Sequence, residues 1–286
     1  MSRYSRQIAL PQVGPEGQQK LAAARVLIVG LGGLGAPVAL YLAAAGVGTL
    51  LLCDGDAVDA SNLQRQVLFG ENDVGQPKVT SAVAALKRLN SEIDIVPLAN
   101  FVDAENVNSL VSNCDIVVDC TDNLPVRYLL NDACLAHGKP LVYGALHRFE
   151  GQVSVFCLPG APCFRCYFPN EASAENAVTC QEAGVFGVLP GIVGSLQANE
   201  VLKLILRLGT YPDSSKSSSP ISKSSARSCQ ILIFDAITMN FDKLKLQRRP
   251  DCLCQNASLT SSEFADTSRA AAGPISSSSS SGIALI

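Results

Sequence analysis

Four charged side chains and one amide follow short apolar runs in the first half of the chain, and their chemistry suits a phosphorylated ligand. Arginine grips phosphate through a two-pronged guanidinium, and lysine acts as a point charge. Aspartate is a natural ligand of Mg²⁺, directly or through water. Gathered beside a glycine-rich turn, these groups suit a nucleoside triphosphate with magnesium better than a dinucleotide. The residues are Asp54, Asn62, Arg65, Lys78 and Asp122.

The stretch over residues 26–35 predicts the element that would position a phosphate. A β-branched apolar run meets glycines at 30, 32, 33 and 35, and an Ala/Leu-rich segment follows. This is the order strand, tight turn and helix, in which the helix directs free N–H groups and the positive end of its dipole at an anion. The next strand, 49–53, ends at Asp54, about 20 residues after the turn, where an acid takes a ribose hydroxyl. The alternative is a turn that only packs its helix on the sheet.

Helical and strand-like segments alternate along the chain and predict an α/β fold. We expect a doubly wound, Rossmann-like, mainly parallel sheet with an antiparallel C-terminal extension and a cysteine-rich loop. Because the carboxyl ends of parallel strands share one edge, the charged residues should share one crevice. The expected helices are 15–23, 76–90, 104–112, 126–137 and 194–208; the strands are 93–100, 114–123, 140–144, 151–157 and 230–235; residues 158–192 are expected to be a loop, and 240–249 partly β.

The chain divides into one domain and a tail. We expect the domain to cover residues 1–255, with a flexible Ser/Lys-rich insertion at about 212–228. Residues 256–286 are Ser/Ala-rich, and such a composition cannot bury enough apolar surface to offset the entropy of ordering it. We therefore expect a disordered tail.

Composition narrows the class of protein. The 286 residues are 48% hydrophobic with a mean hydropathy of +0.24, so the chain can bury a large core. The net charge of −3 argues against a nucleic-acid-binding body. No apolar run reaches the ~18 residues of a membrane helix, and the N-terminal residues lack the apolar core of a signal peptide. We therefore expect a cytoplasmic protein whose eleven cysteines are mostly reduced, so cysteine pairs indicate metal or redox sites before disulfides.

Seven motifs, in order, resemble the MoeB/ThiF/HesA family, the bacterial relatives of ubiquitin-activating enzymes. The resemblance covers residues 3–254 and is strongest to the molybdopterin-synthase adenylyltransferases, with the thiamine-pathway adenylyltransferases next. The motifs are Arg3-Tyr-Ser-Arg6-Gln, the turn over 30–35, Ser61-Asn-Leu-Gln-Arg65-Gln, Gly75-Gln-Pro-Lys78, Asp119-Cys-Thr-Asp122-Asn123, Glu150-Gly-Gln and Thr179-Cys180-Gln-Glu-Ala-Gly184.

The resemblance implies ATP-dependent adenylation of the C-terminal Gly-Gly carboxylate of a small β-grasp sulfur-carrier protein. The favoured carrier is the small subunit of molybdopterin synthase, and the thiamine sulfur carrier is the alternative. A homodimer is implied, in which Arg6 reaches the triphosphate bound by the other subunit, and a sulfurtransferase or cysteine desulfurase is a further candidate partner. Neither nucleic acid nor membrane is expected. The implied nucleotide contacts are Gly33, Asp54, Ser61, Asn62, Leu63, Gln64, Arg65, Lys78, Asp122 and Asn123, with Asp122 also holding Mg²⁺.

The implied reaction makes physical sense of these residues. A C-terminal carboxylate has a pKa of ~3.5 and is already an anion at neutral pH, so it needs no general base, and the chain has only two histidines. The barrier lies in bringing that anion to a triphosphate and stabilising the leaving pyrophosphate. Electrostatic catalysis is therefore assigned to Arg6, Arg65, Lys78 and Mg²⁺ on Asp122.

Five cysteines have an expected role through the same resemblance. Two pairs, Cys163/Cys166 and Cys252/Cys254, resemble the structural zinc site of the family, in which four thiolates form a tetrahedron. The second pair, which ends at Cys254, has one intervening residue where the family has two. Buried free thiols or a relic site are the alternatives. Cys180 corresponds to a cysteine that forms a thioester or persulfide in some relatives, and a cysteine without catalytic role is the other interpretation.

Two other classes of function stay open at this point. A nicotinamide-dependent oxidoreductase would use the same glycine turn, but it lacks a proton donor and leaves Arg65, Lys78 and Asp122 without a role. A non-catalytic scaffold that binds the carrier would explain the altered cysteine spacing, although the charged residues argue against it.

Overall fold

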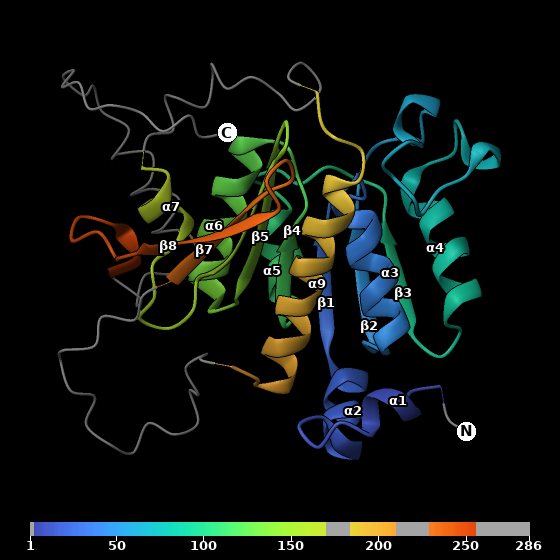
Figure 1. Ribbon diagram of the computed structural model, residues 1–286, viewed down its shortest axis with the longest axis horizontal. Helices are drawn as coiled ribbons and strands as arrows, with labels where there is room; N and C mark the ends of the chain where they lie inside the picture. The colour runs from blue at the N-terminus through green and yellow to red at the C-terminus, as the bar shows by residue number, and fades with distance from the viewer. Residues whose placement is uncertain (1–2, 170–183, 210–228, 256–286) are drawn as a thin grey trace.

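The computed structural model describes residues 3–169, 184–209 and 229–255, and these build one eight-stranded sheet (Figure 1). Its order is β3-β2-β1-β4-β5-β6-β7-β8. The first five strands of this order are parallel, and β6, β7 and β8 are added antiparallel. The expected fold class is confirmed. The strands are β1 Arg25–Val29, β2 Thr49–Cys53, β3 Asp94–Leu98, β4 Ile116–Asp119, β5 Leu141–His147, β6 Glu150–Phe156, β7 Cys229–Asp235 and β8 Asn240–Leu246.

Helices cover both faces of the parallel part of the sheet. Along β1, Val26 and Ile28 belong to one apolar cluster and Leu27 and Val29 to another, as expected for a strand buried on both sides. Helices α3, α4 and α9 pack on the first face, and α5, α6 and α7 lie against the second. The helices are α1 Ser5–Ile8, α2 Gly14–Ala23, α3 Gly35–Ala45, α4 Lys78–Leu89, α5 Val107–Ser112, α6 Leu124–His137, α7 Phe164–Tyr167 and α9 Leu189–Leu206, with 3-10 turns Ala60–Asn62, Glu71–Asp73 and Leu253–Gln255.

The expected loop over 158–192 is wrong at two places. Residues 164–167 form α7, and α9 begins at Leu189 rather than at 194. The glycines, prolines and cysteines of this stretch and its poor periodicity predicted a loop, yet proline, here Pro190, suits the first turn of a helix. Gly194 lies where α9 crosses α3, and a Cβ there would come 2.5 Å from the Leu34 carbonyl oxygen. Gly194 therefore lies inside the helix, where it permits close packing, and is not the first residue of the helix as expected.

Several expectations fall outside the described residues. The insertion over 212–228, the tail over 256–286 and Cys180 all lie there. Within the described ranges, no helix combines the length and apolar character needed to cross a membrane. The cytoplasmic location stays a prediction.

Candidate nucleotide site and cysteine cluster

A pocket of about 370 Å³ opens at the carboxyl ends of the parallel strands. It lies where the strand order changes direction, between β1 and β4, the place where open α/β sheets bind ligands. The sequence-predicted residues that line it are Gly33, Asp54, Asn62, Arg65, Lys78, Asp122 and Asn123.

The glycine turn forms one wall of the pocket and depends on the absence of side chains. Gly30 has φ +89°, and a Cβ there would lie 2.8 Å from the Cys120 carbonyl oxygen at the end of β4. At Gly33 a Cβ would come 2.9 Å from Pro190 in the first turn of α9. The turn leads into α3 at Gly35, so the positive end of the helix dipole faces the pocket.

Asp54 and Lys78 form a partly buried charge cluster beneath this wall. Asp54 is 8% exposed, and its carboxylate accepts from the backbone N–H of Leu31 at 2.6 Å and of Asp56 at 2.8 Å. Burial raises the pKa of Asp54, which these N–H groups and Lys78 oppose. The Lys78 ammonium lies 3.0 Å from Asp56 and 4.0 Å from Asp54. These acids compensate a lysine that would otherwise oppose the dipole of α4.

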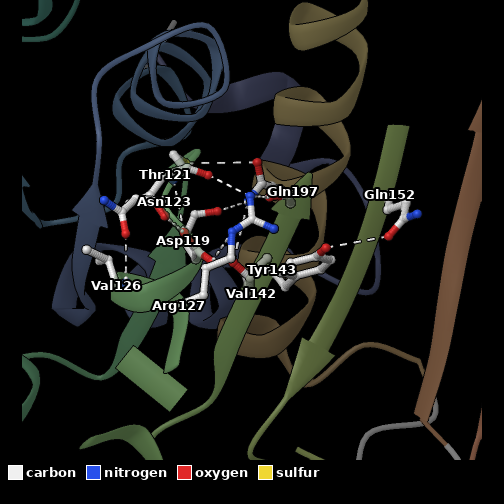
Figure 2. Close-up of polar contacts among 11 residues, drawn as sticks. Asp119, Thr121, Asn123, Val126, Arg127, Val142, Tyr143, Gln152 and Gln197 are labelled. Carbon is white, nitrogen blue, oxygen red and sulfur yellow. Dashed lines mark hydrogen bonds and ion pairs between the residues drawn. The ribbon is translucent and has the colours of Figure 1, made fainter. Parts of the chain in front are cut away.

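A second charge cluster fixes the end of β4 (Figure 2). Asp119 is fully buried, and burial raises its pKa while Arg127 opposes that shift. The Arg127 guanidinium lies 3.7 Å from the Asp119 carboxylate, donates to the Thr121 carbonyl at 2.6 Å, and lies 4.9 Å from the centre of the Tyr143 ring. From the opposite face, Gln197 in α9 donates to the Asp119 carbonyl at 2.8 Å. The segment that carries Asp122 is thereby held from both sides.

Asn123 and three residues of the 61–65 motif have other local partners. The Asn123 side chain caps α6 by accepting from the Val126 N–H at 3.1 Å. Ser61 donates to Asp59 at 2.5 Å, and Leu63 packs on the apolar core. Ser61, Leu63 and Gln64 do not line the pocket, whereas Arg65 does, and its guanidinium donates to the Ser61 carbonyl at 3.2 Å.

Arg6 lies at the other edge of the sheet. Arg6 is exposed on α1, and the helices α1 and α2 lie next to each other below the strands in the view of Figure 1. Next to it, Gln7 donates to the Ala45 carbonyl at the last residue of α3, whose first turn borders the pocket. At about 1.5 Å per residue, the 11 residues of α3 separate its ends by about 16 Å. Arg6 does not reach the pocket of its own chain.

Several residues that line the pocket were not among the predicted site residues. Their positions, in the first turn of a helix or just after a strand, were the signal that could have identified them. Arg127 lies in the first turn of α6, where a cation opposes the helix dipole as Lys78 does in α4. Asp56 and Phe101 follow β2 and β3 at the same edge. Gln66 is 4% exposed, lines the pocket, and has a carboxamide oxygen without a hydrogen-bond partner among the described residues.

The two cysteine pairs meet away from the pocket, beside α7. Their four sulfurs lie within 4.8 Å of one another. Cys163 is 3.5 Å from Cys252 and 4.0 Å from Cys166, and Cys166 is 3.6 Å from Cys254. Four sulfurs at ~2.3 Å from a tetrahedral zinc would lie about 3.8 Å apart. The donor set and the spacing fit zinc, and Cys254 takes its place despite the shortened spacing.

Comparison with known proteins decides the family. Residues 4–256 match the profile of the ThiF family. This chain belongs to the ThiF family. The ThiF-family chain is 47% identical to the molybdopterin-synthase adenylyltransferase of Escherichia coli K12, with 88% of this chain and 95% of that protein covered. It is 44% identical to the SAMP-activating enzyme E1 of Haloferax volcanii, covering 93% of each.

Other relatives extend beyond the ThiF-family chain. It is 49% identical to the adenylyltransferase and sulfurtransferase MOCS3 of Sus scrofa over 92% of its length, but it spans only 55% of that protein. Among solved structures, E. coli MccB with ATP superposes with a TM-score of 0.70 at 24% identity, covering 89% of this chain and 74% of MccB. At that identity, the likeness shows a shared fold.

Proposed function

We propose that this chain uses ATP to adenylate the C-terminal carboxylate of a small sulfur-carrier protein. The observation that carries the proposal is the pocket, where Arg65, Lys78 and Asp122 surround a glycine turn at the switch point of the sheet. The names of several relatives support it: besides the molybdopterin-synthase adenylyltransferase of Escherichia coli, they include a sulfur carrier protein adenylyltransferase of Thermus thermophilus at 44% identity.

In the proposed reaction, a carboxylate oxygen of the carrier attacks the α-phosphorus of ATP. A P–O bond forms, the bond to the β-phosphate breaks, and pyrophosphate leaves with its electron pair, giving an acyl-adenylate. Arg65 and Lys78 would neutralise the phosphates, and the amino end of α3 would face them. Asp122, an exposed carboxylate at the pocket, has the oxygen ligands that Mg²⁺ takes, and bound Mg²⁺ would offset charge on the leaving group.

A group of exposed apolar side chains supports a protein substrate, and we call it the apolar rim. It adjoins the pocket through Val185, which lines the pocket and pairs with Arg148, next to Phe149. Phe149, Phe186, Val188, Ile237 and Met239 are large apolar side chains between 44% and 69% exposed. The rings of Phe149 and Phe186 lie 5.6 Å apart, and the Ala236 N–H donates to the Phe149 carbonyl, so two neighbouring turns contribute to the rim. Exposed apolar groups gathered in this way favour a docking surface. We propose the small subunit of molybdopterin synthase as the carrier, with the thiamine sulfur carrier as the alternative.

A homodimer would complete the site. Arg6 is remote from its own pocket, so its expected contact with the triphosphate requires a second copy of the chain. The proposal also includes one zinc ion on the cysteine cluster, where it would tie the 163–166 turn to the 252–254 segment. Zinc well below one per chain in purified protein would contradict that part.

The first test replaces the proposed magnesium ligand. Asp122→Ala should abolish ATP–pyrophosphate exchange with carrier present, by at least ~100-fold, because the leaving group loses its counter-charge. The fold should persist, since Asp122 is exposed. Asp94→Ala, an exposed aspartate on β3, is the matched control and should exchange normally. Unimpaired exchange by folded Asp122→Ala would remove Asp122 from the mechanism.

A second measurement distinguishes among the candidate carriers and among the alternative classes of function. Candidate carriers are immobilised, the chain is captured on them, and exchange is assayed with each carrier that binds. Exchange with only one carrier would identify the substrate. Binding without exchange would favour a scaffold, and turnover of NAD without exchange would favour an oxidoreductase.

A further inference from the structure

One aromatic side chain lines the pocket within the described part of the chain, and it is largely uncovered. Phe101 is 65% exposed, although burying a benzyl group away from water is favourable. It follows β3, which ends at Leu98 and lies outside β2 at the margin of the sheet. An exposed ring that borders a pocket is a natural platform for a flat ligand group.

The ring is held in place by its surroundings. A Cβ on Gly55 would come 2.7 Å from two carbons of the Phe101 ring, so the ring lies directly over the Gly55 backbone. Asn106 donates to the Phe101 carbonyl at 2.8 Å, and Asp103 accepts from the Asn106 N–H at 2.9 Å. The Cys53 thiol donates to the Asn100 carbonyl at 3.2 Å on the other side of Phe101. The backbone is therefore held before and after the ring, which lowers the entropy lost when a ligand stacks on it.

The positions of the other pocket residues indicate which part of a bound nucleotide lies beside Phe101. The phosphates belong at the glycine turn with Arg65, and Asp54, at the end of β2, is the expected ribose contact. A nucleotide laid in that order would continue outward from β2 toward β3, which puts its base beside Phe101. Cys53 and Val102, which also line this end, add an apolar border.

We propose that Phe101 stacks on the adenine of ATP, and that Gly55 is needed to let the ring lie in that position. This inference rests on the proposed use of ATP. It assigns to Phe101 ground-state binding of the base and no part in the chemical step. Its loss should therefore raise Kd and KM for ATP and leave kcat unchanged.

The test compares ATP with inorganic tripolyphosphate, which has no base, by calorimetry on the full chain. Stacking on an aromatic ring is worth about 5- to 150-fold in affinity. Phe101→Ala should weaken ATP binding by at least about fivefold and leave tripolyphosphate binding unchanged. Phe101→Leu, which keeps apolar volume without a ring, should behave like the alanine variant, and Phe101→Trp should restore affinity. Gly55→Ala, which displaces the ring without removing it, should also weaken ATP binding.

The possible outcomes distinguish the stacking role of Phe101 from the proposed function of the chain. Equal losses for ATP and tripolyphosphate, or full affinity in Phe101→Leu, would overturn the stacking role. Ring-dependent ATP binding by a chain that shows no pyrophosphate exchange with any carrier would leave the inference standing and overturn the proposed function. A wild-type chain that does not bind ATP would overturn both.

Discussion

Cys53, at the last position of β2, shows how burial beside the pocket controls a single residue. It is 1% exposed, and its thiol donates to the Asn100 carbonyl at 3.2 Å. Burial, with a smaller contribution from the adjacent Asp54 carboxylate, raises the pKa of the Cys53 thiol from 9.0 to about 12. The thiolate form is disfavoured, so we expect Cys53 to be inert toward alkylating reagents in the folded protein.

The raised pKa of Cys53 makes stability depend on pH in alkaline solution. Between the unfolded pKa of 9.0 and the folded value of about 12, the unfolded thiol loses its proton and the folded thiol keeps it, so the free energy of unfolding falls as pH rises. Relative to Cys53→Ser, the wild type should lose about 1 kcal/mol more between pH 8 and 10. Urea unfolding at both pH values measures this, and parallel losses in the two proteins would contradict it.

At the scale of elements, α6 presents the first cysteine pair. Asn131 accepts from the Phe164 N–H at 2.8 Å, and Asp132 forms a two-point ion pair with Arg165 at 2.6 and 2.7 Å. The Arg165 guanidinium lies 4.8 Å from the centre of the Tyr128 ring. These contacts hold the turn between Cys163 and Cys166 independently of the second pair.

Removing that support should weaken metal binding. Asp132→Ala should lower zinc affinity about 10- to 100-fold, as loss of an outer-shell contact does elsewhere. Competition with a chromophoric chelator measures it. The matched control is Glu200→Ala, which removes an ion pair of similar length, 2.8 Å to Lys203 in α9, from a helix that contributes none of the four cysteines. Equal zinc retention in wild type and Asp132→Ala would show that the cysteines need no positioning by α6.

The crossing of α9 on α3 supplies a second element-scale prediction. Gly194→Ala should lower Tm by several degrees, because its Cβ would meet the Leu34 carbonyl oxygen and the Pro37 ring, each at 2.5 Å. Gly191→Ala, on the same helix, meets nothing within 4 Å and should raise stability by up to ~1 kcal/mol through helix propensity. Thermal unfolding of the two variants separates packing from propensity. Equal shifts would mean that the crossing tolerates a methyl group.

At the scale of the whole molecule, the two ends of α3 separate the pocket from the arm that carries Arg6. If two copies exchange this arm, Arg6→Ala mixed with Lys78→Ala should recover part of the pyrophosphate exchange. Each hybrid dimer then has one complete site of its two. Random pairing makes about half of the dimers hybrids, so about a quarter of all sites are complete. Each variant alone is the control. No recovery despite demonstrated subunit exchange would exclude a shared site.

The amino-acid sequence by itself determined the alternation of strands and helices and the edge at which the charged residues meet. Each strand end is marked locally, by an apolar run followed by glycine or an acid, and parallel strands bring such ends to one side. Asp54, Arg65, Lys78 and Asp122 therefore line one pocket as predicted. The family could also be inferred, because its motifs are short and read in order.

Only the tertiary structure decided how the remaining side chains are directed. Ser61 and Leu63 belong to the same motif as Arg65 but turn elsewhere, because a short 3-10 turn sends neighbouring side chains in different directions. Cys254 reaches the cluster despite its spacing, since distant packing sets the path by which its segment arrives. Phe101 and Arg127 gain their places through contacts made across the fold with Gly55 and Tyr143. Long-range contacts of this kind leave no periodic signal in the chain.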